Sequence, residues 1–173
     1  MANFGEKLKT VLHIAPIVGT LGSVSVALHW PDEKATQAWA AALATKPALR
    51  NAVIELHGEL GAGKTTLVRY LLHALGVQGR IKSPSYAVME PHQVNGLNIS
   101  HFDFYRFSDP REWEDAGFRD VFSAPGLKLI EWADSARAAL GVPDLAIHIT
   151  ANADDSRSVT LRGNTAAGAI LIA

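Results

Sequence analysis

The chain has 173 residues, of which 48% are hydrophobic, so it is long enough to form one domain with a packed core. Its 16 basic and 17 acidic residues give a net charge of −1, which argues against strong independent binding to nucleic acid. The absence of cysteine excludes disulfides, thiolate metal sites and cysteine nucleophiles, and it fits the reducing environment of the cytoplasm.

The N-terminal segment is apolar but repeatedly interrupted. From Thr10 to Pro31 there is no Asp, Glu, Lys or Arg. A membrane-spanning helix needs about 20 mostly apolar residues, whereas prolines, glycines and hydroxyl side chains recur in this stretch. We therefore expect no membrane span. Residues 1–22 are predicted to be an N-terminal extension outside the core, and residues 23–173 to form one domain.

The first half of that domain alternates strands with helices. Period-two patterning and short apolar runs indicate strands, and a stripe of leucines ending at Gly76 indicates a helix. In chain order we predict a strand over 23–28, a helix that begins at 31–32 and ends at 46–47, a buried strand over 52–56, a glycine-rich loop over 58–64 and a helix over 65–75.

Strands crowd the second half, where Asn95-Gly96 is a strong signal for a tight hairpin turn. In chain order we predict strands over 85–89 and 97–104, a turn at 109–110 and a helix over 111–122 interrupted by Gly117. These are followed by a strand over 127–130 that precedes Glu131, a short helix over 135–140, and strands over 145–150, 158–162 and 169–173. This order indicates an α/β core with a mixed parallel/antiparallel sheet.

A phosphate-binding loop is the main functional signal. Residues 58–65 read Gly-Glu-Leu-Gly-Ala-Gly-Lys-Thr and fit the pattern G-x-x-x-x-G-K-[ST] between a strand and a helix. Glycines let backbone N–H groups surround a triphosphate, and the N-terminus of the following helix points at it. Lys64 is expected to reach the β and γ phosphates, Thr65 to ligate Mg²⁺ and Thr66 to contact the α phosphate.

The motif predicts an ATP-binding domain over residues 23–173 with a P-loop NTPase-like three-layer fold. Guanine-specific proteins usually carry an [NT]-K-x-D segment, and Thr45-Lys46-Pro47-Ala48 lacks its Asp, so adenine is the expected base. The nucleotide-binding residues predicted from the loop are Glu59, Leu60, Gly61, Ala62, Gly63, Lys64, Thr65 and Thr66.

Two acidic residues lie at the ends of predicted strands and could support Mg²⁺ at this loop. Glu131 ends the apolar run 127–130, and Asp103 lies at the end of the strand before it. Since the ends of neighbouring strands meet at one edge of a sheet, both are candidates for the site. The alternative is that each is an ordinary surface carboxylate at a strand end.

Further motifs accompany the loop: Lys-Ser-Pro-Ser-Tyr at 82–86, His-Phe-Asp-Phe-Tyr-Arg at 101–106 and Leu-Ile-Glu-Trp at 129–132. This spaced combination, over about residues 24–162, resembles the TsaE (YjeE) family of ATPases in bacterial tRNA threonylcarbamoyladenosine synthesis. The resemblance implies an ATP- and Mg²⁺-dependent accessory subunit of the complex that forms N6-threonylcarbamoyladenosine at position 37 of ANN-decoding tRNAs. Its implied partners are the TsaD and TsaB subunits, with tRNA involved only indirectly.

The resemblance also implies roles for individual residues. Lys64 corresponds to the phosphate lysine, Thr65 and Glu131 to the Mg²⁺ site, and Asp103 to an acidic residue that either orients the attacking water or supports Mg²⁺. The remaining positions that the resemblance implies are a switch segment at Ser83, Pro84 and Ser85, Thr36 near the adenine, Arg157 near the nucleotide, and Trp132 near the site or a partner surface.

Two other functions remain open on the sequence alone. A small-molecule kinase would also suit a compact P-loop chain, but it usually carries a mobile arginine-bearing lid, and no insertion of that kind is evident. A non-catalytic nucleotide-binding module is the third possibility. The presence of Lys64, Thr65, Asp103 and Glu131 together argues against it.

Overall fold

The computed structural model describes residues 23–107, 112–113 and 116–173. The predicted extension over residues 1–22 and the predicted turn at 109–110 lie outside the described residues. The strands are β1 (Val24–Trp30), β2 (Val53–His57), β3 (Met89–Val94), β4 (Leu97–Asp103), β5 (Leu127–Glu131), β6 (Leu145–Ala151) and β7 (Arg157–Gly163).

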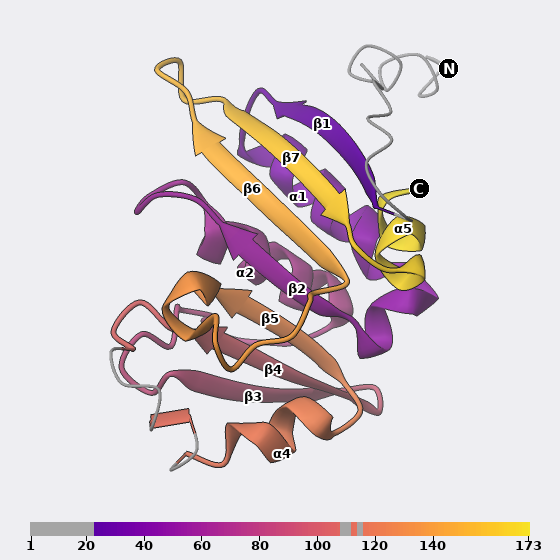
Figure 1. Cartoon of the computed structure of the whole chain (residues 1–173). Coiled ribbons are helices and arrows are strands. Elements are labelled where there is room, and N and C mark those ends of the chain that lie inside the picture. Colours follow the sequence, from indigo (N-terminus) through magenta and orange to yellow (C-terminus); the bar gives the residue numbers. More distant parts are fainter. Residues whose placement is uncertain (1–22, 108–111, 114–115) are drawn as a thin grey trace.

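These strands form one seven-stranded sheet in the order β1-β7-β6-β2-β5-β4-β3 (Figure 1). The central strand β2 pairs in parallel with both β5 and β6, and β4 pairs in parallel with β5. The outer pairs β1–β7, β6–β7 and β3–β4 are antiparallel. The predicted α/β fold with a mixed sheet is confirmed.

The α-helices are α1 (Glu33–Ala44), α2 (Lys64–Leu75), α4 (Phe118–Ser123) and α5 (Ala166–Ile172), and two 3₁₀ helices are η1 (Pro47–Asn51) and η2 (Ala133–Ala136). Helices α1 and α2 pack against each other behind the sheet as drawn in Figure 1. Asp32 begins α1 by accepting a hydrogen bond from the Ala35 N–H at 2.9 Å, and Gly76, with φ of 105°, ends α2. Both helix boundaries agree with the prediction.

The two faces of the sheet carry separate hydrophobic clusters because side chains alternate along each strand. Ile99 of β4 and Leu129 of β5 pack with α1 and α2 in the larger cluster. Their neighbours Phe102 and Ile130 point to the other face, where they pack with Phe118 of α4 in an aromatic cluster. Strands β4 and β5 are thus buried on both faces, which fixes the carboxyl ends of both strands.

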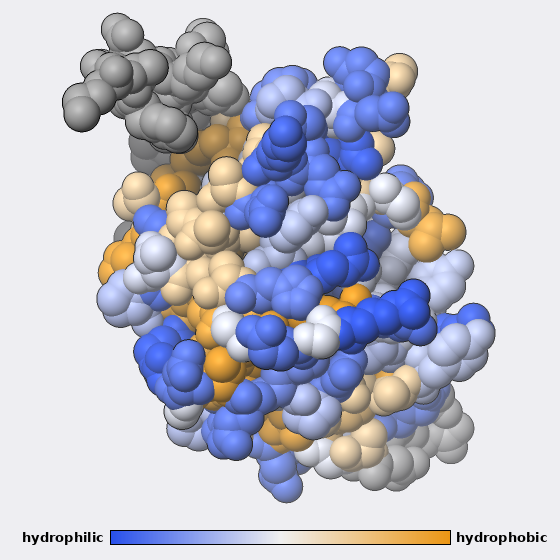
Figure 2. Space-filling model, turned by 180° about the vertical axis from the view of Figure 1, so that it is seen from behind, coloured by the Kyte–Doolittle hydropathy of each residue, from blue (hydrophilic) through white to orange (hydrophobic). Residues whose placement is uncertain are grey.

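The surface over α1 and α2 is mainly hydrophilic, with hydrophobic groups gathered toward one flank (Figure 2). Val24 of β1 and Ile170 of α5 are exposed by 43% and 56%, and α5 packs against β7 and β1. Within the described residues, no helix is long and apolar enough to cross a membrane.

Two predicted strands are wrong. Residues 85–87 form a turn, with Val88 in the left-handed region at φ of 64°, and β3 begins only at Met89. Residues 169–173 lie mostly in α5, whose N-terminus is capped by Thr165 accepting from the Gly168 N–H at 3.1 Å. A short apolar run does not distinguish a strand from a buried helix, and the capping threonine decides between them here.

Two predicted helices differ from the structure in extent. In the predicted helix over 111–122, residues 112–113 are helical and Gly117, with φ of 68°, precedes α4; residues 111 and 114–115 lie outside the described residues. In place of a helix over 135–140 the chain forms η2 and then turns. The predicted hairpin is confirmed, because Asn95 and Gly96 with φ of 49° and 71° join β3 to β4.

Candidate nucleotide-binding site

The loop between β2 and α2 has a conformation that glycine makes possible. Gly58, Gly61 and Gly63 have φ of 144°, 81° and 112°, a region that other residues rarely occupy. A Cβ atom at Gly58 would also clash with the backbone carbonyl of Ile149 on β6. The loop therefore wraps tightly against the sheet before α2 begins at Lys64.

Lys64 turns back over this loop and is 5% exposed. Its Nζ donates to the carbonyl oxygens of Gly58 and Glu59 at 2.6 and 2.9 Å, and it lies 4.1 Å from the centre of the Trp132 ring. Burial lowers the pKa of Lys64, while Glu131, Asp103 and Glu59 act in the opposite direction. The ammonium group is thus held at the mouth of the loop, where a phosphate could replace the two carbonyls.

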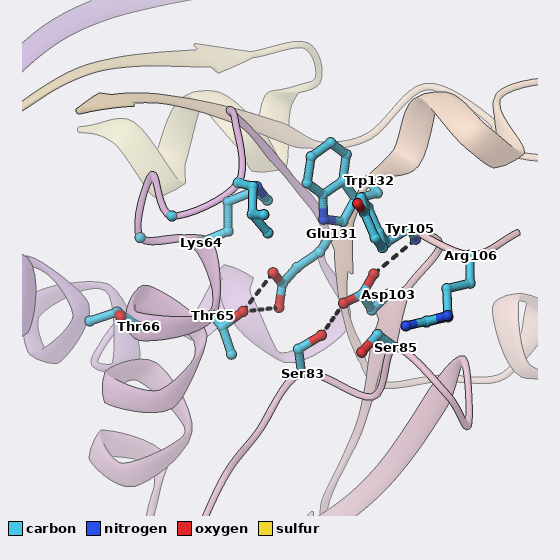
Figure 3. A pocket seen from close by; sticks show the side chains of 13 residues that line it. Lys64, Thr65, Thr66, Ser83, Ser85, Asp103, Tyr105, Arg106, Glu131 and Trp132 are labelled. Atoms are coloured by element: carbon cyan, nitrogen blue, oxygen red, sulfur yellow. Dashed lines mark hydrogen bonds between the residues drawn. The ribbon is translucent and has the colours of Figure 1, made fainter.

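Thr65, in the first turn of α2, meets the carboxylate at the end of β5. Its Oγ1 lies 3.0 and 2.8 Å from Oε1 and Oε2 of Glu131 (Figure 3). In the parallel pairing of β4 with β5, Asp103 lies directly opposite Glu131, and the two side chains are 3% and 2% exposed. The two predicted acidic residues are therefore neighbours inside the site and not surface carboxylates.

Asp103 connects the site to the segment before β3. Its Oδ2 accepts a hydrogen bond from the Ser83 hydroxyl, and its Oδ1 accepts from the Tyr105 N–H at 2.9 Å (Figure 3). Pro84, between the two serines, is buried and its carbonyl accepts from the Val88 N–H at 2.6 Å. The irregular segment over 83–85 thus contacts Asp103 through Ser83, and Ser83 and Ser85 both line the cavity described next.

A cavity of about 320 Å³ brings most of these groups together. Its lining comes from the loop, the segment before β3, and the ends of β4 and β5. It comprises Leu60, Gly61, Gly63, Lys64, Thr65, Thr66, Ser83, Ser85, Asp103, Tyr105, Arg106, Glu131 and Trp132.

A second cavity of about 320 Å³ adjoins the first, and Gly63 and Thr66 line both cavities. It includes Thr36, which is 6% exposed, and Arg157. Arg157 Nε donates to the Ala62 carbonyl at 2.8 Å, so this side chain braces the loop from β7. Thr36, predicted near the adenine, and Arg157, predicted near the nucleotide, therefore line a cavity beside the loop that does not include Glu131.

The predicted loop residues line different cavities. Ala62 is buried and lines the second cavity, whereas Glu59 and Leu60 are exposed at the tip of the loop. Glu59 lines neither of the two larger cavities; it lies beside a third of about 250 Å³, next to β6.

Several site residues were missed by the sequence analysis. Tyr105 and Arg106 line the first cavity, and Tyr105 packs against Trp132 with ring centres 4.9 Å apart. The motif over 101–106 contains both, and their position next to Asp103 could have indicated them. The second cavity also includes Trp30, Pro31, Asp32, Glu33 and Asp155, for which the sequence holds no comparable signal.

The residues present suit a magnesium ion. Thr65 and Glu131 offer a hydroxyl and a carboxylate side by side, and Asp103 is adjacent; these are the hard oxygen donors that Mg²⁺ prefers. Among the described residues, no group of three or more His, Cys, Asp or Glu is arranged to hold a metal. Mg²⁺ in nucleotide sites is usually held by one or two protein groups together with phosphate oxygens and water, which this arrangement allows.

Comparison with known proteins gives a consistent result. The family model of the threonylcarbamoyl adenosine biosynthesis protein TsaE matches residues 30–159. The tRNA threonylcarbamoyladenosine biosynthesis protein TsaE of Haemophilus influenzae is 41% identical over 120 residues, covering 69% of this chain and 75% of the relative. The protein of the same name from Bacillus subtilis is 35% identical over 108 residues, covering 62% of this chain and 67% of the relative.

A solved structure shares the same architecture. The crystal structure of Bacillus subtilis YdiB superimposes with a TM-score of 0.71 at 25% sequence identity, covering 87% of this chain and 93% of YdiB. This similarity extends over nearly the whole chain and supports the predicted P-loop NTPase-like α/β fold.

Proposed function

The chain belongs to the TsaE family of tRNA threonylcarbamoyladenosine biosynthesis proteins, and on that premise we propose that it is a Mg²⁺-dependent ATPase. The observation that carries the proposal is the contact between Thr65, directly after the phosphate-binding lysine, and Glu131, with Asp103 beside it. A hydroxyl and two carboxylates next to a phosphate-binding loop are the groups that ATP hydrolysis with Mg²⁺ requires.

Some of these residues would bind the nucleotide and Mg²⁺, and Asp103 would act in hydrolysis. Lys64 would exchange its two carbonyl contacts for oxygens of the β and γ phosphates, and Thr65 with Glu131 would hold Mg²⁺. When bound, Mg²⁺ would neutralise charge that develops on the phosphates. Asp103 would orient the attacking water or support Mg²⁺, and its hydrogen bond with Ser83 would report the nucleotide state to the segment over 83–85.

We further propose that the activity serves the complex that modifies adenosine 37 of ANN-decoding tRNAs. The partners would be TsaD and TsaB, and the cytoplasm would be the location. The net charge of −1 suits a subunit that contacts tRNA only indirectly. Hydrolysis would then be slow in isolation and would depend on the partner subunits.

Reconstitution tests the proposal. ATP consumption by the full chain is measured alone, with TsaD and TsaB, and with tRNA, while threonylcarbamoyladenosine is quantified in the tRNA. The expected result is that the partners raise ATP hydrolysis and that multiple rounds of modification require this chain. A phosphorylated small molecule formed in step with ADP would make the protein a kinase, and binding without turnover would make it a non-catalytic module.

A further inference from the structure

A buried histidine lies behind the proposed magnesium site. The side chain of His101, in β4, is 0% exposed, and its Nε2 lies 2.9 Å from Oε1 of Glu131. A carboxylate only accepts hydrogen bonds, so the Nε2–H of His101 must be the donor. Glu131 is itself 2% exposed, which makes this a hydrogen bond inside the protein and not at its surface.

The imidazole and the Thr65 hydroxyl hold the same carboxylate from two elements. His101 lies in β4, two residues before Asp103, and so points to the same face of the sheet as Asp103. Thr65 meets Glu131 from α2, at 2.8 Å from the oxygen that His101 does not contact. The Thr65 hydroxyl lies within hydrogen-bond distance of both carboxylate oxygens (Figure 3), and His101 contacts Oε1, so the carboxylate has little freedom to rotate away from the cavity.

Packing alone does not account for an imidazole at this position. Nδ1 of His101 is buried and has no hydrogen-bond partner among the described residues. An unpaired buried polar atom costs about 1–3 kcal/mol, a penalty that an apolar side chain beside Ile99 would avoid. Within the part of the chain that the structure describes, the one hydrogen bond of the ring is the bond to Glu131, and an apolar side chain could not make it.

We propose that His101 is a positioning residue for the magnesium site: its Nε2–H fixes the Glu131 carboxylate in the orientation that Mg²⁺ binding needs. The inference rests on the proposed function. Carboxylates that ligate metals are commonly held by such outer hydrogen bonds, and loss of one typically weakens metal affinity by 10–100-fold.

Three substitutions separate positioning from packing. His101→Leu fills the space without a donor. His101→Gln can place its amide nitrogen near the position of Nε2, whereas the shorter His101→Asn reaches only as far as Nδ1. The Mg²⁺ dependence of ATP binding by the full chain is measured by calorimetry, with excess EDTA as the magnesium-free reference and thermal unfolding as the check of folding.

The Mg²⁺ concentration at half-maximal binding should rise by about 10–100-fold in the Leu and Asn variants and return close to the wild-type value in the Gln variant. Binding in EDTA should be the same in all four proteins. An unchanged midpoint in His101→Leu, or equal midpoints in the Gln and Asn variants, would overturn the inference while leaving the ATPase proposal intact. Absence of Mg²⁺-dependent binding in the wild type would refute the proposed function itself, and the inference with it.

Discussion

Lys64 and Thr65 are consecutive residues whose side chains are held by different parts of the chain. Lys64 contacts the carbonyls of its own loop, whereas Thr65 reaches the carboxylate of Glu131, 66 residues further on. The first contact is local to the loop over 58–65 that the motif identifies. The second depends on β5 lying next to β2, so it exists only once the sheet has formed.

At the scale of single residues, removing the negative charge of Glu131 tests the site directly. Glu131→Gln keeps the shape of the side chain and removes its negative charge, so it should lower Mg²⁺-dependent ATP turnover by more than about tenfold, or about 1.4 kcal/mol. Turnover is measured with the partner subunits present. Asp120→Asn, which removes an exposed carboxylate of α4, is the control and should leave turnover near the wild-type rate. Equal rates for both variants would remove Glu131 from the site.

His92 provides a prediction about pH. Burial lowers its pKa, nearby His101 acts in the same direction, and Glu90 opposes both. The folded protein therefore takes up this proton less readily than the unfolded chain, whose histidines titrate near about pH 6.5. Proton uptake by the unfolded chain therefore lowers the free energy of unfolding as the pH falls below about 6.5, whereas above that pH His92 is neutral in both states and has no such effect.

Urea unfolding between about pH 5 and 7.5 would measure this effect. The free energy of unfolding of the wild type should decline as the pH falls below about 6.5. His92→Gln, which cannot take up a proton, should make the decline shallower. Parallel declines in the two proteins would show that His92 does not contribute.

At the scale of elements, the connection from β2 to α2 depends on Gly58. Gly58→Ala adds a Cβ at φ of 144° that would meet the Ile149 carbonyl, so both strain and a clash oppose it. We expect a loss of about 3 kcal/mol or more in the free energy of unfolding. Gly79→Ala, at φ of 92° with open space around it, is the matched control and should cost about 1–2 kcal/mol. Chemical denaturation compares the two, and equal losses would contradict the role of the close contact.

The elements also mark the limits of what the sequence could predict. Helix α2 has a leucine stripe, a P-loop before it and Gly76 after it, so local patterning was sufficient. The apolar residues of α5 have no such period, and their helical state depends on the Thr165 cap and on packing against β7. Similarly, the turn over 85–87 depends on the hydrogen bond from the Val88 N–H to Pro84, which no spacing of apolar residues indicates.

In the site, too, residues marked by local sequence patterns could be predicted, whereas residues brought together only by the fold could not. Lys64, Asp103 and Glu131 could be predicted because each ends or begins an element with a clear pattern. In the second cavity the family resemblance indicated Thr36 and Arg157, but nothing in the sequence indicated Trp30 of β1 and Asp155, which are far apart in the chain. Only the antiparallel pairing of β1 with β7 brings them together.

Across the whole molecule, an ion pair ties the central strand to the segment after β5. Glu55 of β2 is 2% exposed, and its Oε2 accepts from Arg137 Nη2 at 2.6 Å and lies 3.1 Å from His57 Nε2. Burial acts to raise the pKa of Glu55, but the hydrogen bonds with His57 and Arg137 outweigh it and leave the pKa below its ordinary value. The resulting stabilisation is complete above the unfolded-state pKa of about 4.3 and is lost as the pH falls through the lower folded-state value.

Arg137→Gln should therefore lower the free energy of unfolding at pH 7 by about 1.5–3 kcal/mol, because it leaves a buried carboxylate without its charged partner. The double variant Glu55→Gln/Arg137→Gln should lose less than the sum of the two single variants, since it removes the unpaired charge. Urea unfolding of the four proteins measures the coupling. Strict additivity would mean that the ion pair contributes nothing.

The pairing of Asp103 opposite Glu131 makes the length of β5 as important as its composition. Side chains alternate between the faces of a strand, so deleting one residue from the middle of β5 would turn Glu131 toward the face that carries Phe118 and bring Trp132 to the position opposite Asp103. The sequence would still contain both acidic residues, but the proposed magnesium site would lose the carboxylate of Glu131. The number of residues between the turn at Gly126 and Glu131 is therefore constrained by the pairing with β4, as strictly as the apolar character of β5 is constrained by its burial.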